Sequence, residues 1–414
     1  MFTYKKENQL PVKSWIPKED YYADEKMVEQ VENLAKLPFA FHHIALSPDG
    51  HVGYGMPIGG VLATRQVIIP NAVGVDIGCG MCAVKTSLTE LDTETLKKIM
   101  GEIRKVVPVG FNKHQEEQDR GLMPDNGSIL DNTPIVLQEY NNALKSLGTL
   151  GGGNHFIEIQ KGSDGHIWIM IHSGSRNLGK QVADHYNKVA KDLNEKWHSS
   201  IPKKYDLAFL PLDSEEGQAY IREMNYCVDF ALANRKLMME RVKNIFSKVL
   251  EVSTDLNCDD DETWKEYSKR VDWLLFKPMI NIAHNYAKLE NHFGQNVMVH
   301  RKGATLASKK TIGIIPGSQG TKSYIVKGLG NPESFNSCSH GAGRKMGRKE
   351  SQRTLNLEEE VSKLNKLGVI HAIRNEKDLD EAPGSYKYID EVMSNQKDLV
   401  KVLVELTPLA VVKG

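Results

Sequence analysis

Short apolar runs alternate with glycine-bearing polar turns over the first part of the chain. The runs VLATRQVIIP (61–70) and MCAVKTSL (81–88) are rich in β-branched and apolar residues, which favours strands. The segment SPDGHVGYGMPIGG (47–60) carries the glycines and prolines that are typical of turns. Residues 39–88 are therefore predicted to form a loop-rich sheet region.

Helical and strand patterns follow. Residues 92–107 have the pattern of a helix, and 155–160 and 166–172 are predicted to be two strands joined by the turn KGSDG. Each of these strands has a histidine at one end.

The pattern becomes helical after Leu178. It covers 180–197 and 215–251, and one apolar stripe of the second helix contains Met238, Val242, Ile245, Phe246 and Val249. The acidic segment CDDDETWKEY (258–267) predicts a solvated link. We interpret 180–275 as a helical insertion, whose methionines and aromatic residues belong to a core rather than to a cofactor site.

Strand patterns return in VMVHRKGAT (297–305), KTIGIIPGSQGTKSYIVKG (310–328) and the final LVKVLVELTPLAVVKG (399–414). The predicted fold class is α+β, with a mixed β-sheet core and surrounding helices. We expect one catalytic domain over 1–414 that contains the helical insertion.

Composition limits the partners and the compartment. The 414 residues include 53 Lys and Arg against 53 Asp and Glu, so no whole-protein field favours nucleic acid or membrane, and a polyanion would need a local patch. Five cysteines without a repeating spacing favour a reducing compartment, and the cytoplasm is expected. The sequence has no apolar leader and no uninterrupted apolar stretch of about eighteen residues. Membrane insertion is therefore not predicted.

The segment VGVDIGCGMCAVKTSL (73–88) places Asp76, Cys79 and Cys82 among glycines. A C-x-x-C pair is found in redox sites and in zinc ribbons. No second pair completes a ribbon, and a strand pattern rather than a helix follows the pair. We therefore expect Cys82 to point inward from a strand and Cys79 to be free to bind a metal ion.

Metal sites with nitrogen, sulfur and oxygen ligands gather thiolates, imidazoles and carboxylates from several strands or loops. The candidates are Asp76, Cys79, Cys82, His155, His172, His284 and His340. Any one of these histidines alone is more often a satisfied buried imidazole, but together they favour a metal centre. By ligand softness alone, a Cys/His set favours zinc.

Three glycine-rich segments, GTLGGGNHF, PGSQGTKS and SHGAGRK, can turn backbone N–H groups toward phosphate oxygens. None has the spacing of a P-loop. Arg176 and Arg344 add guanidinium groups that suit phosphate, although either arginine could instead form a surface ion pair.

Together, these segments resemble the RtcB family of RNA ligases from about Phe39 to Gly414. The motifs that carry the resemblance are PDGHVGYGMPIGGVLAT, VGVDIGCGM, GTLGGGNHFIEI, IHSGSRNLG, AHNYA, HRKGAT, IIPGSQGTKSYIVKG, SCSHGAGRKMGR, DEAPGSYK and the terminal VVKG.

The resemblance implies a GTP- and manganese-dependent ligase that joins RNA ends bearing a 2′,3′-cyclic phosphate or 3′-phosphate to 5′-hydroxyl ends, in tRNA splicing or RNA repair. His340 matches the histidine that becomes guanylylated, before an RNA-(3′)pp(5′)G end forms. The implied ligands are Asp76, Cys79 and His155 for one Mn²⁺ and Cys79, His172 and His284 for the second. The implied guanylate contacts are Asn154, His155, Phe156, Ile157, Glu158, His284, Asn285, Pro316, Gly317, Ser318, Gln319, Ser323, His340, Gly341, Ala342, Gly343 and Lys413.

Three positions depart from the family pattern. Gln319 stands where methionine is commoner, Gly347 where serine is commoner and Tyr388 at a usual aspartate. Two other functions compete with ligation. A dinuclear metal-dependent phosphoesterase would use the same metal ligands without His340 as nucleophile, and a non-catalytic RNA-binding protein would interleave aromatic and basic residues on a sheet face. The sequence shows no such interleaving, and it leaves the oligomeric state open, with a monomer as the simplest case.

Overall fold

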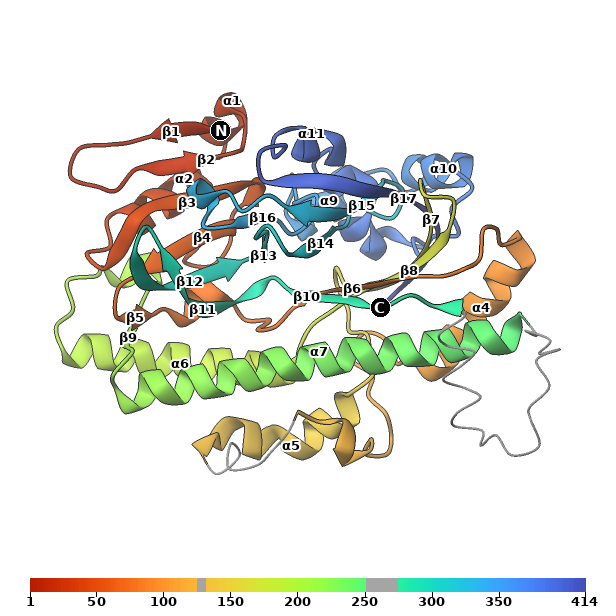
Figure 1. Ribbon diagram of the computed structural model, residues 1–414, viewed down its shortest axis with the longest axis horizontal. Helices are drawn as coiled ribbons and strands as arrows, with labels where there is room; N and C mark the ends of the chain where they lie inside the picture. The colour runs from red at the N-terminus through yellow and green to blue at the C-terminus, as the bar shows by residue number, and fades with distance from the viewer. Residues whose placement is uncertain (125–131, 251–274) are drawn as a thin grey trace.

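The computed structural model describes residues 1–124, 132–250 and 275–414, with two large β-sheets at its centre (Figure 1). The six-stranded sheet has the order β1 (Phe2–Tyr4), β2 (Val12–Ser14), β3 (Ala40–His51), β4 (Ile58–Thr64), β12 (Gln295–Lys302), β11 (Asn285–His292). The seven-stranded sheet has the order β10 (Ile280–Ala283), β6 (Gly80–Lys85), β8 (Ile167–Ser173), β7 (Phe156–Gly162), β17 (Val400–Lys413), β15 (Ser323–Gly328), β14 (Ile312–Ile315). Its neighbouring strands are antiparallel, whereas β2 and β3 of the first sheet run parallel.

Two short strand pairs complete the β-structure. They are β13 (Ala304–Leu306) with β16 (Ser337–Ser339), and β5 (Val67–Ile68) with β9 (Leu210–Pro211). The longer helices are α2 (Glu25–Ala35), α4 (Thr93–Val106), α5 (Pro134–Ser146), α6 (Arg176–Lys196), α7 (Glu215–Val249) and α10 (Leu357–Lys366), and the shorter ones are α1 (Lys18–Ala23), α3 (Pro70–Val73), α9 (Arg348–Thr354) and α11 (Ile389–Ser394). The α+β class is confirmed. None of the helices within the described ranges has the length and apolarity needed to cross a membrane.

Several predicted elements are confirmed. Helix α4 falls within 92–107, β7 and β8 form the predicted hairpin, and β17 is the predicted final strand. One boundary was wrong, because β3 continues through the segment from Ser47 to His51 that was predicted as turn. The pairing register of β3 with β4 shifts between Leu46 and His51, and such an irregularity re-aims side chains that a regular strand would alternate.

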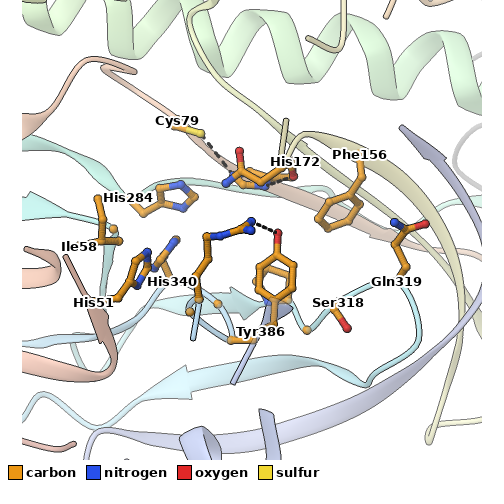
Figure 2. A pocket seen from close by; sticks show the side chains of 18 of the residues that line it. His51, Ile58, Cys79, Phe156, His172, His284, Ser318, Gln319, His340 and Tyr386 are labelled. Atoms are coloured by element: carbon orange, nitrogen blue, oxygen red, sulfur yellow. Dashed lines mark hydrogen bonds between the residues drawn. The ribbon is translucent and has the colours of Figure 1, made fainter. Parts of the chain in front are cut away.

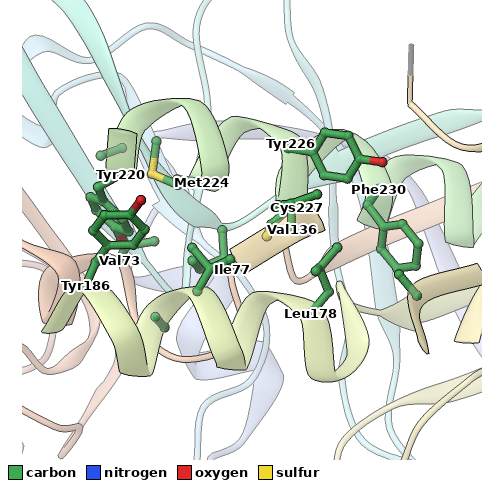
Figure 3. Close-up of a cluster of buried hydrophobic side chains, with 14 of the residues drawn as sticks. Val73, Ile77, Val136, Leu178, Tyr186, Tyr220, Met224, Tyr226, Cys227 and Phe230 are labelled. Carbon is green, nitrogen blue, oxygen red and sulfur yellow. The ribbon is translucent and has the colours of Figure 1, made fainter. Parts of the chain in front are cut away.

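The helices of the 180–275 segment form core, as expected from their apolar stripes. Figure 3 shows α6 and α7 packing through residues such as Leu178, Tyr186, Tyr220 and Phe230. Farther along α7, the predicted stripe packs against isoleucines of β7 and β8, with Met238, Val242, Ile245 and Phe246 buried and Val249 partly buried. The predicted acidic link at 258–267 lies outside the described residues.

Candidate active site

A cavity of about 340 Å³ lies between residues of both large sheets, and all three glycine-rich segments reach it. His51 of β3 and Ile58 of β4 line one side, and Phe156 of β7 and Lys413 of β17 line the other. Figure 2 shows His284 and His340 near one end and Gln319 near the other.

The predicted metal ligands meet at one end of this cavity. The Sγ atom of Cys79 lies 3.4 Å from Nε2 of His155 and 3.3 Å from Nε2 of His172. Nε2 of His155 lies 3.2 Å from Oδ2 of Asp76. Candidate ligand atoms lie within 4.8 Å of one another in two groups that share Cys79, namely Asp76, Cys79 and His155, and Cys79, His172 and His284. Each group could hold a cation, and the two groups share the Cys79 thiol.

Backbone carbonyls orient two of the imidazoles. Nδ1 of His155 lies 3.0 Å from the Leu150 carbonyl, and Nδ1 of His172 lies 3.0 Å from the Asn154 carbonyl. A proton on each Nδ1 leaves the Nε2 lone pairs directed at the cluster, as metal-binding histidines require. The buried Nδ1 of His284 has no hydrogen-bond partner among the described residues, which makes this nitrogen a candidate ligand atom for a cation.

The charge states suit cation binding. Burial lowers the pKa of His172 and of His284 well below the usual value, so both imidazoles are neutral. Burial opposes ionisation of Asp76, but interactions with His155, Cys79 and Arg176 together outweigh it and hold the Asp76 pKa below its ordinary value. Burial and the Asp76 charge raise the pKa of the Cys79 thiol, so a metal ion must displace the thiol proton when it binds.

Glycines flank Asp76 and Cys79 because other elements press against this loop. A Cβ on Gly78, whose φ is +76°, would lie 2.8 Å from Cα of Val228 in α7. A Cβ on Gly80 would lie 2.0 Å from the Ile282 carbonyl oxygen. The bare backbone therefore lets α7 and β10 close around the metal ligands.

Asp49 fixes His340 at the edge of the metal cluster. The buried Oδ2 of Asp49 accepts hydrogen bonds from His340 Nδ1 (2.6 Å), from the His340 backbone N–H (3.1 Å) and from the Gly341 N–H (3.3 Å). Burial opposes ionisation of Asp49, but His340, His51 and Lys387 together outweigh it and lower the Asp49 pKa. The rings of His340 and His284 are 4.9 Å apart. His340 thus keeps its Nε2 lone pair available beside the metal ligands.

Asp49 was missed by the sequence analysis. It lies in the segment predicted as turn, where an Asp before Gly is an ordinary turn residue. Only its three contacts with 340–341 distinguish it.

The opposite end of the cavity is a group of cations around Glu381. The sequence analysis named Arg344 and Lys413 but gave no role to Glu381 or Arg348. Glu381 contacts Lys413 (2.6 Å), Arg348 (2.7 Å) and Arg344 (3.4 Å), and the Tyr386 hydroxyl donates to it at 2.5 Å. These cations overcome the effect of burial and lower the Glu381 pKa to about 2. The Lys413 side chain is only 10% exposed, so the penultimate residue belongs to the cavity wall.

Most of the implied guanylate contacts line the cavity, and three do not. Ile157 is buried on the core side of β7, His155 turns toward the metal cluster, and Ser323 accepts a hydrogen bond from the Gly317 N–H (3.1 Å) that shapes its loop. Those on the wall are Asn154, Phe156, Glu158, His284, Asn285, Pro316, Gly317, Ser318, Gln319, His340, Gly341, Ala342, Gly343 and Lys413.

The two arginines that the sequence analysis proposed for phosphate binding lie in different places. Arg344 lines the cavity, whereas Arg176 donates to Oγ1 of Thr149 (2.9 Å) and to the Gly110 carbonyl (2.8 Å) and is not part of the wall. Arg176 therefore braces a glycine-rich loop.

Of the three departures from the family pattern, only Gln319 reaches the cavity. Its amide is held by the Ala372 N–H (3.0 Å) and the Glu381 carbonyl (3.1 Å). Gly347 precedes α9, and Tyr388 is 69% exposed with the Lys345 ammonium 5.6 Å from its ring centre.

Comparisons with known proteins identify the family of this chain. The family model described as "tRNA-splicing ligase RtcB" matches residues 30–414. The "RNA-splicing ligase RtcB" of Escherichia coli K12 is 38% identical and covers 98% of this chain and 97% of its own. The "tRNA-splicing ligase RtcB" of Nanoarchaeum equitans is 31% identical over 95% and 94% of the two chains. The chain therefore belongs to the RtcB family.

Proposed function

We propose that this protein is a GTP-dependent RNA ligase that joins 3′-phosphate or 2′,3′-cyclic phosphate ends to 5′-hydroxyl ends, in tRNA splicing or RNA repair. The observation that carries the proposal is His340, held by Asp49 between a metal-ligand cluster and a group of cations. The relatives named as RNA- and tRNA-splicing ligases support the same reaction class.

The ligand cluster fits two divalent cations, since it offers a shared thiol, neutral imidazoles and the vacant Nδ1 of His284. We assign Asp76, Cys79 and His155 to one ion and Cys79, His172 and His284 to the other. Bound there, the cations would neutralise charge on phosphoryl oxygens. The choice of Mn²⁺ comes from the family resemblance, because thiolate softness by itself favours zinc.

His340 acts as the nucleophile in this proposal. The Asp49 carboxylate holds the Nδ1 proton, so Nε2 attacks the α-phosphorus of GTP, forming a P–N bond as the P–O bond to pyrophosphate breaks. An oxygen of the RNA 3′-phosphate then displaces His340 to give RNA-(3′)pp(5′)G. The 5′-hydroxyl attacks the RNA phosphorus, and GMP leaves. A cyclic phosphate end is first opened by water to the 3′-phosphate.

The cation end of the cavity suits the nucleotide. Lys413 and Arg344 line the wall beside the glycine-rich loops, whose N–H groups suit phosphate oxygens. Glu158, on the same wall, offers carboxyl oxygens to the N–H donors of a guanine edge. The described cysteines are free and buried, which suits the cytoplasm.

The test is a sealing assay with two RNA fragments, one ending in 3′-phosphate and one starting with 5′-hydroxyl. We expect a joined product only when GTP and Mn²⁺ are both present. Release of inorganic phosphate without joining, independent of GTP, would instead support the phosphoesterase.

A further inference from the structure

Two polar side chains in the middle of α7 are completely buried. Asn234 and Arg235 both have no exposed surface, although their neighbours on this helix form apolar core. Buried polar groups of this kind are expensive unless they are hydrogen-bonded, and of these two side chains only Nη2 of Arg235 has no partner among the described residues. Their partners are the loops that carry the metal ligands.

Asn234 joins two of these loops. Its Oδ1 accepts hydrogen bonds from the N–H groups of Gly148 (2.7 Å) and Thr149 (3.2 Å), in the segment that leads to His155. Its Nδ2 lies 3.2 Å from Oγ of Ser173 and 3.1 Å from the Gly174 carbonyl, directly after His172. One amide therefore sets the spacing between the backbone segments of two histidines.

Arg235 adds the third loop. Its Nη1 donates to the carbonyls of Gly78 (3.0 Å) and Ser173 (2.8 Å), the residues adjacent to Cys79 and His172. Its Nε donates to Oδ1 of Asn281 (2.8 Å) in β10, the strand that leads to His284. No carboxylate of the described residues is hydrogen-bonded to this buried guanidinium, so an ion pair within them does not explain its presence.

The helix backbone closes on the same loops. A Cβ on Gly78 would lie 2.9 Å from the Cys227 carbonyl oxygen, and a Cβ on Gly148 would lie 2.4 Å from Nη1 of Arg241. Both glycines have positive φ, +76° and +74°. Contact with α7 thus extends from 227 to 241 and is centred on 234–235.

We propose that Asn234 and Arg235 are positioning residues of the metal centre, which hold the loops of Cys79, His155 and His172 at the spacing that the ions require. The inference rests on the metal centre of the proposed function. It makes the helical insertion part of the site and not only a core around it. Outer partners of metal ligands typically change metal affinity by about 10- to 100-fold.

The test is a Co²⁺ titration of chelator-treated protein, followed by the thiolate-to-cobalt absorption, alongside thermal unfolding. We expect Asn234→Ala and Arg235→Lys to bind Co²⁺ about 10- to 100-fold more weakly than the unsubstituted protein. Arg235→Lys keeps the charge without the two-pronged donor, and it provides a folded variant if Asn234→Ala does not fold.

Two substitutions in α7 serve as controls. Phe246→Leu disturbs a fully buried position about three turns away and loses stability, and Lys236→Ala changes an exposed neighbour. The Co²⁺ affinity of both controls should lie within about twofold of that of the unsubstituted protein. This change is much smaller than the loss of about 10- to 100-fold that is expected when an outer partner of a metal ligand is removed. Unchanged Co²⁺ affinity in both site variants would overturn the inference while leaving the metal centre intact. The same would follow if Phe246→Leu lost as much Co²⁺ affinity as a site variant with the same melting temperature. Failure of the unsubstituted protein to bind Co²⁺ or Mn²⁺ would instead contradict the metal centre itself.

Discussion

The two ends of the cavity are built from opposite chemistry. At one end, Asp76, Cys79 and neutral imidazoles offer lone pairs, and the buried Nδ1 of His284 is unsatisfied among the described residues. At the other end, lysine and arginine side chains surround Glu381, and their charges are already partly compensated. His340 lies beside the first end, fixed by Asp49.

Because of this difference in chemistry, the two ends should respond differently to their ligands. In the proposed function the lone-pair end holds cations, so its geometry and the stability of the protein should depend on metal. The cation end is held together by Glu381, so it should be formed before the nucleotide binds.

The largest effect is expected at the shared thiol. Cys79→Ala should lower the metal content of both sites and reduce RNA sealing by at least about 10³-fold, because metal ions supply several kcal/mol to phosphoryl transfer. Cys82 is buried in β6 away from the cavity wall, so Cys82→Ala should keep most activity. Metal analysis and sealing rates check both variants, and equal losses would favour a paired-cysteine site.

Asp49→Asn should separate nucleophile activation from metal binding. The amide keeps the shape but no longer imposes the tautomer with a proton on His340 Nδ1. The rate of guanylylation should fall by about 10²- to 10⁴-fold, within the range of general-base effects. Mn²⁺ content should be unchanged, and a parallel loss of metal would show that Asp49 supports the lone-pair end instead.

Removal of Lys413 and Gly414 should weaken only the cation end. The truncation deletes the 2.6 Å contact between Lys413 and Glu381, so half-maximal guanylylation should need about 10-fold more GTP, as expected for a lost charge-assisted contact. Metal content should not change. Lys401→Ala, at an exposed position of the same strand β17, is the matched control. Superimposable GTP curves for the truncated and full chains would remove Lys413 from the nucleotide site.

Two buried carboxyl groups near the cation end should give opposite pH effects on stability. Burial raises the pKa of Glu158 from 4.5 to about 8, so the folded protein holds a proton that the unfolded chain has lost. This contribution to stability therefore falls as pH rises from about 4.5 to about 8. Glu381, whose pKa is lowered to about 2, has the opposite effect. Its contribution to stability is lost as pH falls from about 4.5 to about 2.

The contribution of Glu158 to stability is measured by the melting temperature of metal-free protein from pH 5 to pH 8. The difference in melting temperature between the unsubstituted protein and Glu158→Gln separates this contribution from that of other groups. Glu158→Gln should lose less stability toward pH 8. Parallel curves would mean that Glu158 is ionised in the folded state.

The sequence predicted the lone-pair end well, because its residues carry chemistry that is visible in the letters. Cys79 and the histidines lie in glycine-rich segments or at strand ends, and these converge as expected. The long helices and the final strand were also predictable from periodicity. The inclusion of 47–51 in β3 was not, because proline and glycine there suggest a turn and only the register shift accommodates them.

The cation end and the braces were harder to predict. Glu381 and Asp49 are ordinary loop residues until the fold surrounds one with cations and buries the other beside His340. Asn234 and Arg235 occur in a helical pattern, where polar residues are usually assigned to the solvated face. Their roles depend on contacts between residues more than forty positions apart, which periodicity does not contain.

The central claim is that His340 carries the guanylate, and mapping the adduct tests it most directly. The protein is incubated with GTP labelled in the α-phosphate and Mn²⁺, digested under alkaline conditions that preserve a phosphoramidate, and analysed by mass spectrometry. The account predicts one GMP on the peptide that contains His340, and none in His340→Ala, which should still bind Mn²⁺. A GMP adduct on another residue, or one that persists in His340→Ala, would contradict it.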